Sequence, residues 1–389
     1  MESKACRIVT IKEIVPLFKG EEQANAIELA LLEEIGNTIV VGKDMYKQGD
    51  KALFIQPDYC LSDIPLFQEY LAPGGDPKKN RLGSNNRIKA IKFTLHSGDN
   101  QPTYSYGILL QKKLVNEQLN LELLEDFDWD TELGITKWEE PEPTQKGNQG
   151  AACPFPDNMY KTDEENVNNL INEINFPVNL ILTEKIDGSS ITIWHKNGKS
   201  GIASRKLGRP LTYNKVVGFK KPNIFHKLLT SLTFGKFRYH GKKITKLTEN
   251  DDNFVVRGKS YLEKLNEYGK NIALRGELVG KGCKGSGNPN NPKAKEETHI
   301  EFFGIDDYNE HTKKLPYQEF EAVAKELDLQ VVKKYCEKEF QTKEELFKTC
   351  NEIFAEEKTK GRLIEGVVAR TPDCNLSFKI MSMDYDLKK

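Results

Sequence analysis

The sequence lacks the features that mark secreted, zinc-binding or membrane-spanning proteins. Its seven cysteines are scattered, and no two of them form a Cys-x-x-Cys pair, which argues against a zinc site or a disulfide framework and favours a reducing compartment. No apolar run approaches the roughly 20 residues needed to cross a bilayer, and the polar first residues predict no signal peptide. We therefore expect a soluble intracellular protein, in the cytoplasm or nucleus, that has no membrane partner.

Acidic residues are missing from one long stretch of a chain whose formal net charge is only −1. No Asp or Glu lies between Gly188 and Thr248, although the same stretch is rich in Lys and Arg. Aromatic residues lie among the lysines of its second half, at Phe219, Phe225, Phe234, Phe237 and Tyr239. Such a stretch favours a bound polynucleotide, whose phosphates meet the cations while exposed bases stack on the rings. The alternative is that the rings belong to a core and the lysines only keep an insertion soluble.

At 389 residues the chain is long enough for two or three domains, and we expect an α+β protein with two of them. Residues 1–118 show short apolar strands separated by turn residues, which predicts an OB-like β-barrel. The predicted strands are Cys6–Val15, Ile27–Leu32, Thr38–Val41, Ala52–Gln56, Ile88–Phe93 and Ser105–Leu110. Residues 119–158 are acidic and then rich in proline and glycine, which is typical of a linker. Residues 159–389 form the second predicted domain, with a basic insertion at about 214–254.

Three helices are predicted in the second domain from capping signals and apolar stripes. The first would begin at Thr162, which stands three residues before Glu165 as in a capping box. Its apolar face would consist of Val167, Leu170, Ile171 and Ile174. The other two helices span roughly Tyr317–Leu327 and Lys343–Lys358, and we expect these two to be structural.

A buried strand that ends in charged residues is the clearest functional signal. The apolar run Val178–Leu182 leads toward Lys185, with Asp187 two residues later and Gly188 next. Because side chains alternate along a strand, the ammonium and the carboxylate can share one site. Gly188 allows the chain to turn and lets a ligand approach the backbone closely. Alone, such a tetrapeptide is usually a surface turn, but a strand end aims its side chain into a cleft.

Further charges lie on apolar strands nearer the C-terminus. Glu277 lies near the end of the predicted strand Ile272–Gly280, and the glycine-rich loop after it suits the rim of a phosphate site. Glu301 lies among apolar neighbours, so that a cation is expected beside it, because an unpaired buried acid costs several kcal/mol. The terminal hairpin carries Glu365 and Lys379.

A lysine nucleophile must be neutral, whereas an ordinary lysine, with a pKa of about 10.4, is almost entirely charged at neutral pH. We expect Lys379, Arg205 and a divalent cation to lower the pKa of Lys185. Carboxylates hold hard cations through oxygen, which predicts Mg²⁺ or Mn²⁺ as the metal.

The order of these motifs resembles that of the covalent nucleotidyltransferases, the superfamily of ATP-dependent DNA and RNA ligases and mRNA capping enzymes. The motifs are Lys-x-Asp-Gly, Gly-Glu-Leu, Glu-Phe-Phe-Gly-Ile-Asp, Glu-Gly-Val-Val and a final Phe-Lys. Within this superfamily the chain is similar to the Deinococcus-type RNA ligases, in which an OB domain precedes the nucleotidyltransferase (adenylation) domain. The stretches Gly134–Glu139 and Lys161–Glu164 match that family as well. The resemblance thus covers nearly the whole chain apart from the basic insertion.

The resemblance implies an ATP-dependent RNA ligase that carries AMP on Lys185, with Lys379 as a second catalytic residue. The metal ligands that it implies are Asp187, Glu301 and Glu365. Met381 occupies a position where related enzymes often have a second lysine, and this departure bears on how the leaving group is handled.

The resemblance also implies a nucleotide site. Arg205 and Glu277 would contact the ribose, and Lys379 would contact the α-phosphate. Phe303 would stack on the adenine, the alternative being a plain core phenylalanine. The complete nucleotide-binding set is Glu184, Lys185, Arg205, Glu277, Phe303 and Lys379.

The implied substrate is RNA with 5′-phosphate and 3′-hydroxyl ends, in a nicked duplex, sealed by a monomeric enzyme in RNA repair. A DNA ligase or an mRNA guanylyltransferase of the same superfamily is an alternative, although those enzymes usually place the OB domain after the transferase domain. A non-catalytic nucleic-acid-binding protein is a second alternative, which the complete set of motif residues weakens.

Overall fold

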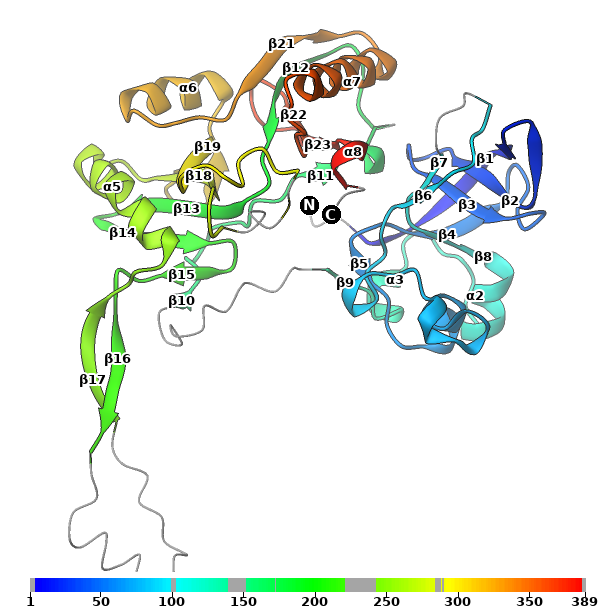
Figure 1. The fold of residues 1–389 in the computed structure, drawn as a ribbon, viewed down its shortest axis with the longest axis horizontal. Coiled ribbons are helices and arrows are strands. Elements are labelled where there is room, and N and C mark those ends of the chain that lie inside the picture. The colour runs from blue at the N-terminus through cyan, green and yellow to red at the C-terminus, as the bar shows by residue number, and fades with distance from the viewer. Residues whose placement is uncertain are drawn as a thin grey trace, which may run out of the picture. The chain divides into compact units, whose positions relative to one another are not determined.

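The computed structural model describes residues 4–98, 103–138, 152–171, 173–220, 243–283, 288 and 290–386 (Figure 1). The chain divides into two compact units. The first contains residues 1–141, 165–178 and 341–343, and the second contains residues 142–164, 179–340 and 344–389. Among the described residues, no helix is long and apolar enough to cross a membrane.

The first unit is built on a five-stranded antiparallel sheet with the strand order β3-β2-β1-β4-β8. The strands are β1 (Cys6–Lys19), β2 (Glu22–Leu32), β3 (Thr38–Gly42), β4 (Lys51–Ile55) and β8 (Ile108–Gln111). Strand β4 is buried on both faces, because Phe54 packs into one core cluster and Leu53 into another. The chain next to β8 approaches β3 at the far side of the sheet, where the Tyr106 amide donates to the Thr38 carbonyl at 2.8 Å. The sheet is therefore strongly curved.

The predicted strands of the first unit are confirmed, with some ends shifted. The stretch Ile88–Phe93 shortens to β6 (Ile91–Phe93), and Ser105–Leu110 divides between β7 (Thr103–Ser105) and β8. The sequence did not predict α2 (Lys112–Leu119), which follows β8 directly. The remaining short elements are β5 (Tyr59–Cys60), α1 (Gln68–Leu71), α3 (Trp129–Glu132) and β9 (Thr136–Lys137).

Residues 119–138 were assigned to the linker, and here the structure corrects the prediction. Trp129 and Leu133 are buried in the core of the first unit. The carboxylate of Asp130 accepts hydrogen bonds from the amides of Ala5 and Cys6 at 2.7 and 2.8 Å. Asp130 therefore satisfies backbone donors, a role that composition alone does not distinguish from solvation.

The helix predicted from Thr162 is wrong. The chain instead forms the short strand β11 (Glu165–Asn166) and one 3₁₀ turn (Val167–Asn169). The Asn166 side chain accepts from the amide of Asn168, and the buried Asn169 amide donates to the side chain of Gln56. Asparagine side chains compete with helical hydrogen bonds in this way, so that the apolar positions are buried without a helix.

The second unit contains a seven-stranded antiparallel sheet with the order β10-β15-β14-β13-β18-β19-β20. Its strands are β10 (Cys153–Pro154), β13 (Ser189–Lys196), β14 (Lys199–Ser204), β15 (Leu207–Arg209), β18 (Ile272–Val279), β19 (His299–Tyr308) and β20 (Thr312–Lys314). Asn197 and Gly198 both have positive φ between β13 and β14, as the central residues of a type I′ hairpin turn require. Helix α5 (Asn253–Tyr268) packs Leu262 and Leu265 onto Ile193 of β13 and its neighbours.

A second sheet of this unit holds β12 (Val178–Lys185), with β22 (Gly366–Arg370) on one side and β21 (Lys334–Phe340) on the other. Strand β23 (Ser377–Met381) pairs with β22, and α8 (Met383–Asp386) follows it. Two predicted helices are confirmed as α6 (Tyr317–Glu326) and α7 (Lys343–Thr359). The strands β16 (Thr212–Phe219) and β17 (Lys243–Glu249) form a separate two-stranded ribbon (Figure 1). This fold brings the ends of β12 and β23 and the start of β22 together.

Candidate active site

Lys185 is the last residue of β12. The strand before it is buried and mostly apolar, whereas Lys185 itself is half-buried. Its Nζ donates to Oε2 of Glu365 at 2.6 Å. The Lys185 side chain is 23% exposed and that of Glu365 is 8% exposed, so that water screens this ion pair poorly. Gly366 pairs with Lys185 on β22, and a Cβ atom at Gly366 would collide with the carbonyl oxygen of Ile380. The sheet is therefore tightly packed beside the lysine.

The cross-strand register places two further positions, 379 and 381, on the same face of the sheet as Lys185. Met381 pairs with Gly366, which in turn pairs with Lys185. One row further along the same face, Lys379 pairs with Val368 of β22. Because directly paired residues share one face of a sheet, Lys185, Met381 and Lys379 project from the same side. A lysine at position 381, which the resemblance led us to expect, would therefore lie on the same face as Lys185.

Asp187 follows the strand and is held by two residues that the sequence did not suggest. The hydroxyl of Tyr385, a fully buried residue of α8, donates to Oδ2 of Asp187 at 2.7 Å. The side-chain amide of Asn291 donates to the Asp187 carbonyl at 2.8 Å. Burial, Asp187 and Glu365 raise the pKa of the Tyr385 phenol far above its ordinary value, so that it stays a donor. Asn291 comes from the glycine-rich loop that was expected to line a phosphate site.

Gly188 has the close contact that its position predicted. A Cβ atom there would lie 2.6 Å from the Leu278 carbonyl oxygen and 2.8 Å from Cγ of Glu277. A residue with a side chain would have to push the turn away from β18. Gly188 thus allows the chain after β12 to lie directly against β18, the strand that carries Glu277.

The carboxylates around Lys185 act on its pKa in the direction opposite to that expected of the predicted cations. Burial alone lowers the pKa of Lys185, but Glu365, Glu277 and Asp187 together raise it above the ordinary lysine value. The two cations that were expected to lower it have a partner of their own. Arg205 binds Asp163 at 3.1 Å, and Lys379 lies 3.9 Å from the same carboxylate.

Asp163 belongs to a short segment that lines a cavity beside these cations. Residues Thr162, Asp163 and Glu164 line the cavity together with Phe303, Arg275 and Lys314. Glu164 accepts from the Ser377 hydroxyl at 2.5 Å and from Lys314 at 3.3 Å. Phe303 is half-buried, whereas its neighbour Phe302 is completely buried in the core. The cavity thus places an aromatic ring and two carboxylates near Arg205 and Lys379.

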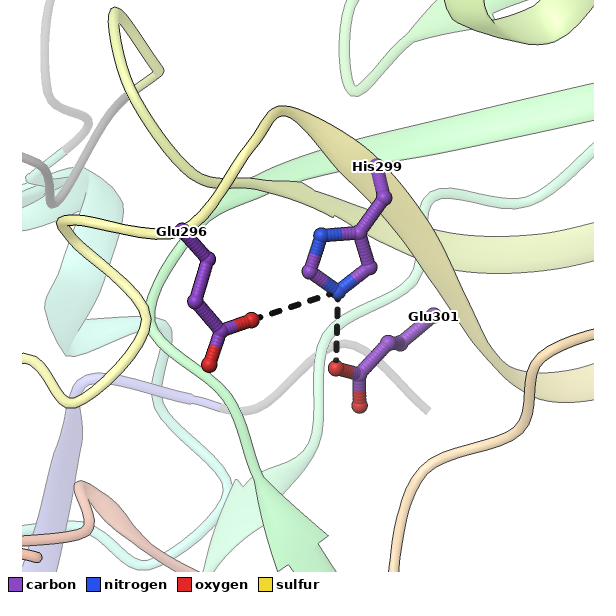
Figure 2. A group of neighbouring side chains, drawn as sticks. All are labelled: Glu296, His299 and Glu301. Atoms are coloured by element: carbon purple, nitrogen blue, oxygen red, sulfur yellow. Dashed lines mark hydrogen bonds and ion pairs between the residues drawn. The ribbon is translucent and has the colours of Figure 1, made fainter.

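Glu301 and Glu277 are directly opposite each other on β19 and β18. A cation was expected beside Glu301, and this is confirmed. Lys293 forms an ion pair with Oε1 of Glu301, and His299 lies 3.1 Å from the same oxygen. Figure 2 shows His299 between Glu301 and Glu296, whose carboxylate is 3.6 Å from the imidazole. These three side chains could together hold a metal ion, although the Lys293 ammonium already contacts the most buried of them.

Glu184 points away from Lys185, as alternation along β12 requires. Both of its carboxylate oxygens accept from Nη2 of Arg362 at 2.9 Å. Burial nevertheless raises the pKa of Glu184, against the opposing effects of Arg362 and Lys293. The described contacts of Glu184 thus place it in a buried ion pair on the other face of the sheet.

The structure brings Lys185, Asp187, Glu277 and Glu365 into one cluster, while Phe303 lines the cavity of Asp163, the carboxylate that Arg205 and Lys379 contact. This arrangement offers an amine for covalent chemistry, carboxylates for a hard cation, and cations for phosphates. The sequence did not suggest Tyr385, Asn291, Asp163, Lys293 or Arg362. Only the match of Lys161–Glu164 to a known family pointed to one of them.

Comparisons with known proteins identify a family for this chain and a similar fold. A model of the RNA ligase family matches residues 178–381, which contain every residue of the Lys185 cluster. No curated protein matches the sequence. Among solved structures, an apo mutant of an RNA ligase from Naegleria gruberi is similar at 23% identity and a TM-score of 0.72, covering 100% of this chain and 99% of that one. A mutant of that ligase with ATP and Mn has 23% identity and a TM-score of 0.71, with the same coverage. Another, with AMP and Mn, has 22% identity and a TM-score of 0.72.

Proposed function

The chain belongs to the RNA ligase family, and on that premise we propose that it seals RNA ends with ATP through a lysyl-AMP intermediate on Lys185. The observation that carries this proposal is the position of Lys185 at a strand end. Its ammonium lies 2.6 Å from Glu365, and the negative charges of Asp187 and Glu277 raise its pKa. A structural lysine has no need of three carboxylates. The similar Naegleria ligase has been solved with ATP and Mn, with AMP and Mn, and with PPi, which supports the same nucleotide chemistry here.

In the first step, the Lys185 amine attacks the α-phosphorus of ATP. A phosphoramidate bond forms, the bond to the β-phosphate oxygen breaks, and pyrophosphate leaves. Lys185 must first lose a proton, because the surrounding carboxylates keep it as an ammonium. Glu365 is hydrogen-bonded to that ammonium, and it is therefore placed to accept the proton.

A divalent cation, Mg²⁺ or Mn²⁺, fits this cluster because three carboxylates face a single ammonium. Asp187 and Glu365 would hold it, with Glu277 beside them, and it would neutralise charge on the phosphates. Glu301, the third expected metal ligand, is engaged with Lys293 and His299, and we propose that it holds these two side chains near Glu277, its partner across the strand pair. Tyr385 and Asn291 keep Asp187 oriented toward the site.

We propose that the nucleotide binds at the cavity that Asp163 and Phe303 line. We assign the adenine to Phe303, the ribose to Arg205 and Glu277, and the α-phosphate to Lys379, while Glu184 supports the strand from its opposite face. Arg205 and Lys379 would exchange Asp163 for the phosphates or ribose when ATP binds. Phosphoryl transfer is accelerated mainly by alignment of the reacting groups and by stabilisation of charge. Cations held in fixed positions provide both.

The later steps act on RNA. A 5′-phosphate oxygen attacks the AMP phosphorus, the lysine nitrogen leaves, and an adenylylated RNA end forms. The 3′-hydroxyl of the other end then attacks that 5′-phosphate, releases AMP and creates a phosphodiester bond. Ends of this kind occur in a nicked duplex, and we propose that a monomer seals them in RNA repair.

We propose that the first unit is an OB-like barrel, as in Deinococcus-type RNA ligases. The curved sheet with the order β3-β2-β1-β4-β8 and the hydrogen bond between Tyr106 and Thr38 support this assignment. The barrel precedes the transferase unit, an order that favours this type over DNA ligases and capping enzymes.

The experiment that tests the proposal is incubation with α-labelled ATP or GTP and a divalent cation, followed by denaturation. We expect label from ATP on the wild-type chain and none on Lys185→Met, which keeps the side-chain length but removes the amine. Lys264→Met is the matched control, since Lys264 lies on α5 with its ammonium on the Leu327 carbonyl, and it should label normally. Label on Lys185→Met would exclude Lys185 as the nucleophile. Label from GTP alone would favour a guanylyltransferase, and sealing of DNA but not RNA ends would favour a DNA ligase.

A further inference from the structure

The ribbon of β16 and β17 stands apart from both large sheets of its unit, as a two-stranded sheet of its own (Figure 1). Its strands pair antiparallel from Thr212 and Glu249 to Phe219 and Lys243, with a bulge between Val216 and Gly218. Such an isolated pair of strands is at best marginally stable by itself. The ribbon therefore needs a role other than support of the core.

The apolar side chains of the ribbon are exposed. Phe219 is 60% exposed and Leu247 is 65% exposed, and Val216, Val217 and Ile244 are exposed as well. Phe219 is the only phenylalanine of the acid-free stretch 188–248 that the structure describes. The alternative that the rings of this stretch belong to a core is wrong for Phe219. Phe225, Phe234, Phe237 and Tyr239 lie outside the described residues. A cluster of exposed apolar side chains on one element marks an interaction surface.

Two lysines of the ribbon repel each other. Lys215 is paired directly with Lys246 across the two strands, an arrangement that destabilises a strand pair because like charges lie side by side. Lys243 pairs with Phe219, so that a cation and a ring share one face, the opposite one from Lys215 and Lys246, because side chains alternate along β17. A polyanion lying along the ribbon would turn the repulsion between Lys215 and Lys246 into attraction for both.

We propose that the β16–β17 ribbon binds an unpaired RNA strand that passes around its edge, with Lys215 and Lys246 on phosphates at one face and Phe219, beside Lys243, stacked on a base at the other. This inference deepens the proposed function, on which it rests, by naming where the substrate docks. An unpaired strand is favoured because the bases of a duplex are already stacked and leave no face for Phe219. A second copy of the chain is disfavoured, because its ribbon would bring lysines against lysines.

The charge part of the proposal is tested by salt dependence. The variant carries Lys215→Ala with Lys246→Ala, and its control carries Lys325→Ala with Lys348→Ala, two exposed lysines of α6 and α7. Affinity for a fluorescein-labelled single-stranded RNA is measured over a series of KCl concentrations. For two lost phosphate contacts, the slope of log K against log salt should become shallower by about 1.4, while the control keeps the wild-type slope. An unchanged slope in the ribbon variant overturns the proposal.

The stacking part is tested at Phe219. Phe219→Ala should weaken binding of the same RNA by about five- to a hundredfold, without changing the salt slope, and Phe219→Trp should restore it. Equal affinity in wild type and Phe219→Ala contradicts the stacking. If Phe219→Ala instead abolishes self-association seen by sedimentation and leaves RNA affinity intact, the surface joins two copies and the proposal is wrong.

Self-adenylylation separates this proposal from the one on which it rests. All ribbon variants should label from ATP like wild type, which also shows that they are folded. Normal labelling with unchanged RNA binding refutes the ribbon alone. A wild-type chain that never labels refutes the proposed ligase chemistry, whatever the ribbon binds.

Discussion

The Lys185 site and the β16–β17 ribbon both concentrate positive charge, but their surroundings are opposite. In the site, cations lie against carboxylates, in the pairs Lys185–Glu365, Arg205–Asp163 and Lys293–Glu301. In the ribbon, Lys215 lies against Lys246. Pairing fixes a side chain in place, as reacting and positioning groups require, whereas a like-charged pair favours a long anion. The number of lysines in a stretch therefore does not distinguish a reactive site from a surface that binds a polyanion. The neighbours of each lysine do.

The largest effect is expected from Glu365→Ala, which removes the partner of Lys185 and one anchor of the metal. Self-adenylylation should fall by about a hundred- to a thousandfold, because charge stabilisation is lost where it develops. Glu297→Ala, which removes an exposed partner of Lys281, should leave the rate unchanged. A near-normal rate in Glu365→Ala would show that Glu365 is not part of the site. If the variant lost RNA affinity as strongly as it lost adenylylation, the site and the ribbon would not have separate roles.

Two neighbouring phenylalanines should separate packing from ligand binding. Phe302→Ala should destabilise the fold by about 3 to 5 kcal/mol in denaturant titrations, because the ring is completely buried. Phe303→Ala should instead raise the KM for ATP by about five- to a hundredfold, on the scale of a base stacked on a ring, with a much smaller loss of stability. Equal destabilisation by both variants would show that Phe303 is a core residue.

Tyr385→Phe should slow adenylylation by about tenfold, since a hydrogen bond to a charged group is worth roughly 1.5 to 3 kcal/mol and part of it can be replaced by water. The variant should also need more Mn²⁺ for half-maximal rate, because Asp187 loses its orientation. Tyr268→Phe is the control, since that hydroxyl bonds to Glu326 on the surface. An unchanged Mn²⁺ requirement would show that Tyr385 only fills space.

The contact between Tyr385 and Asp187 also shows where prediction from sequence ends. The strand that leads to Lys185, the tight turn at Gly188 and the cation beside Glu301 all follow from local pattern, burial and charge, and the structure contains each of them. The contact of Tyr385 spans 198 positions along the chain, and no local signal marks a tyrosine in a polar tail. The helix after Thr162 failed because asparagine side chains bind the backbone there. The prediction for the pKa of Lys185 considered only cations, whereas Glu365 and Glu277, two of the carboxylates that raise this pKa, lie distant in sequence.

The smallest effect is expected on pH dependence. Glu277 is one of the carboxylates that raise the pKa of Lys185, so that Glu277→Gln should lower it. The amine then loses its proton at lower pH, and the rising limb of the adenylylation rate should move toward lower pH even if the maximal rate falls. A limb that stays in place or moves upward would mean that Lys185 does not set it.

Peptide mass spectrometry after incubation with ATP and Mn²⁺ tests the central claim most directly. The account predicts that one peptide, the one containing Lys185, gains the mass of a single AMP, and that Lys185→Met gains none while the ribbon variant with Lys215→Ala and Lys246→Ala gains it normally. AMP on a lysine of the ribbon, or no AMP on any lysine of an RNA-sealing protein, would contradict the division between a reacting site and a docking surface.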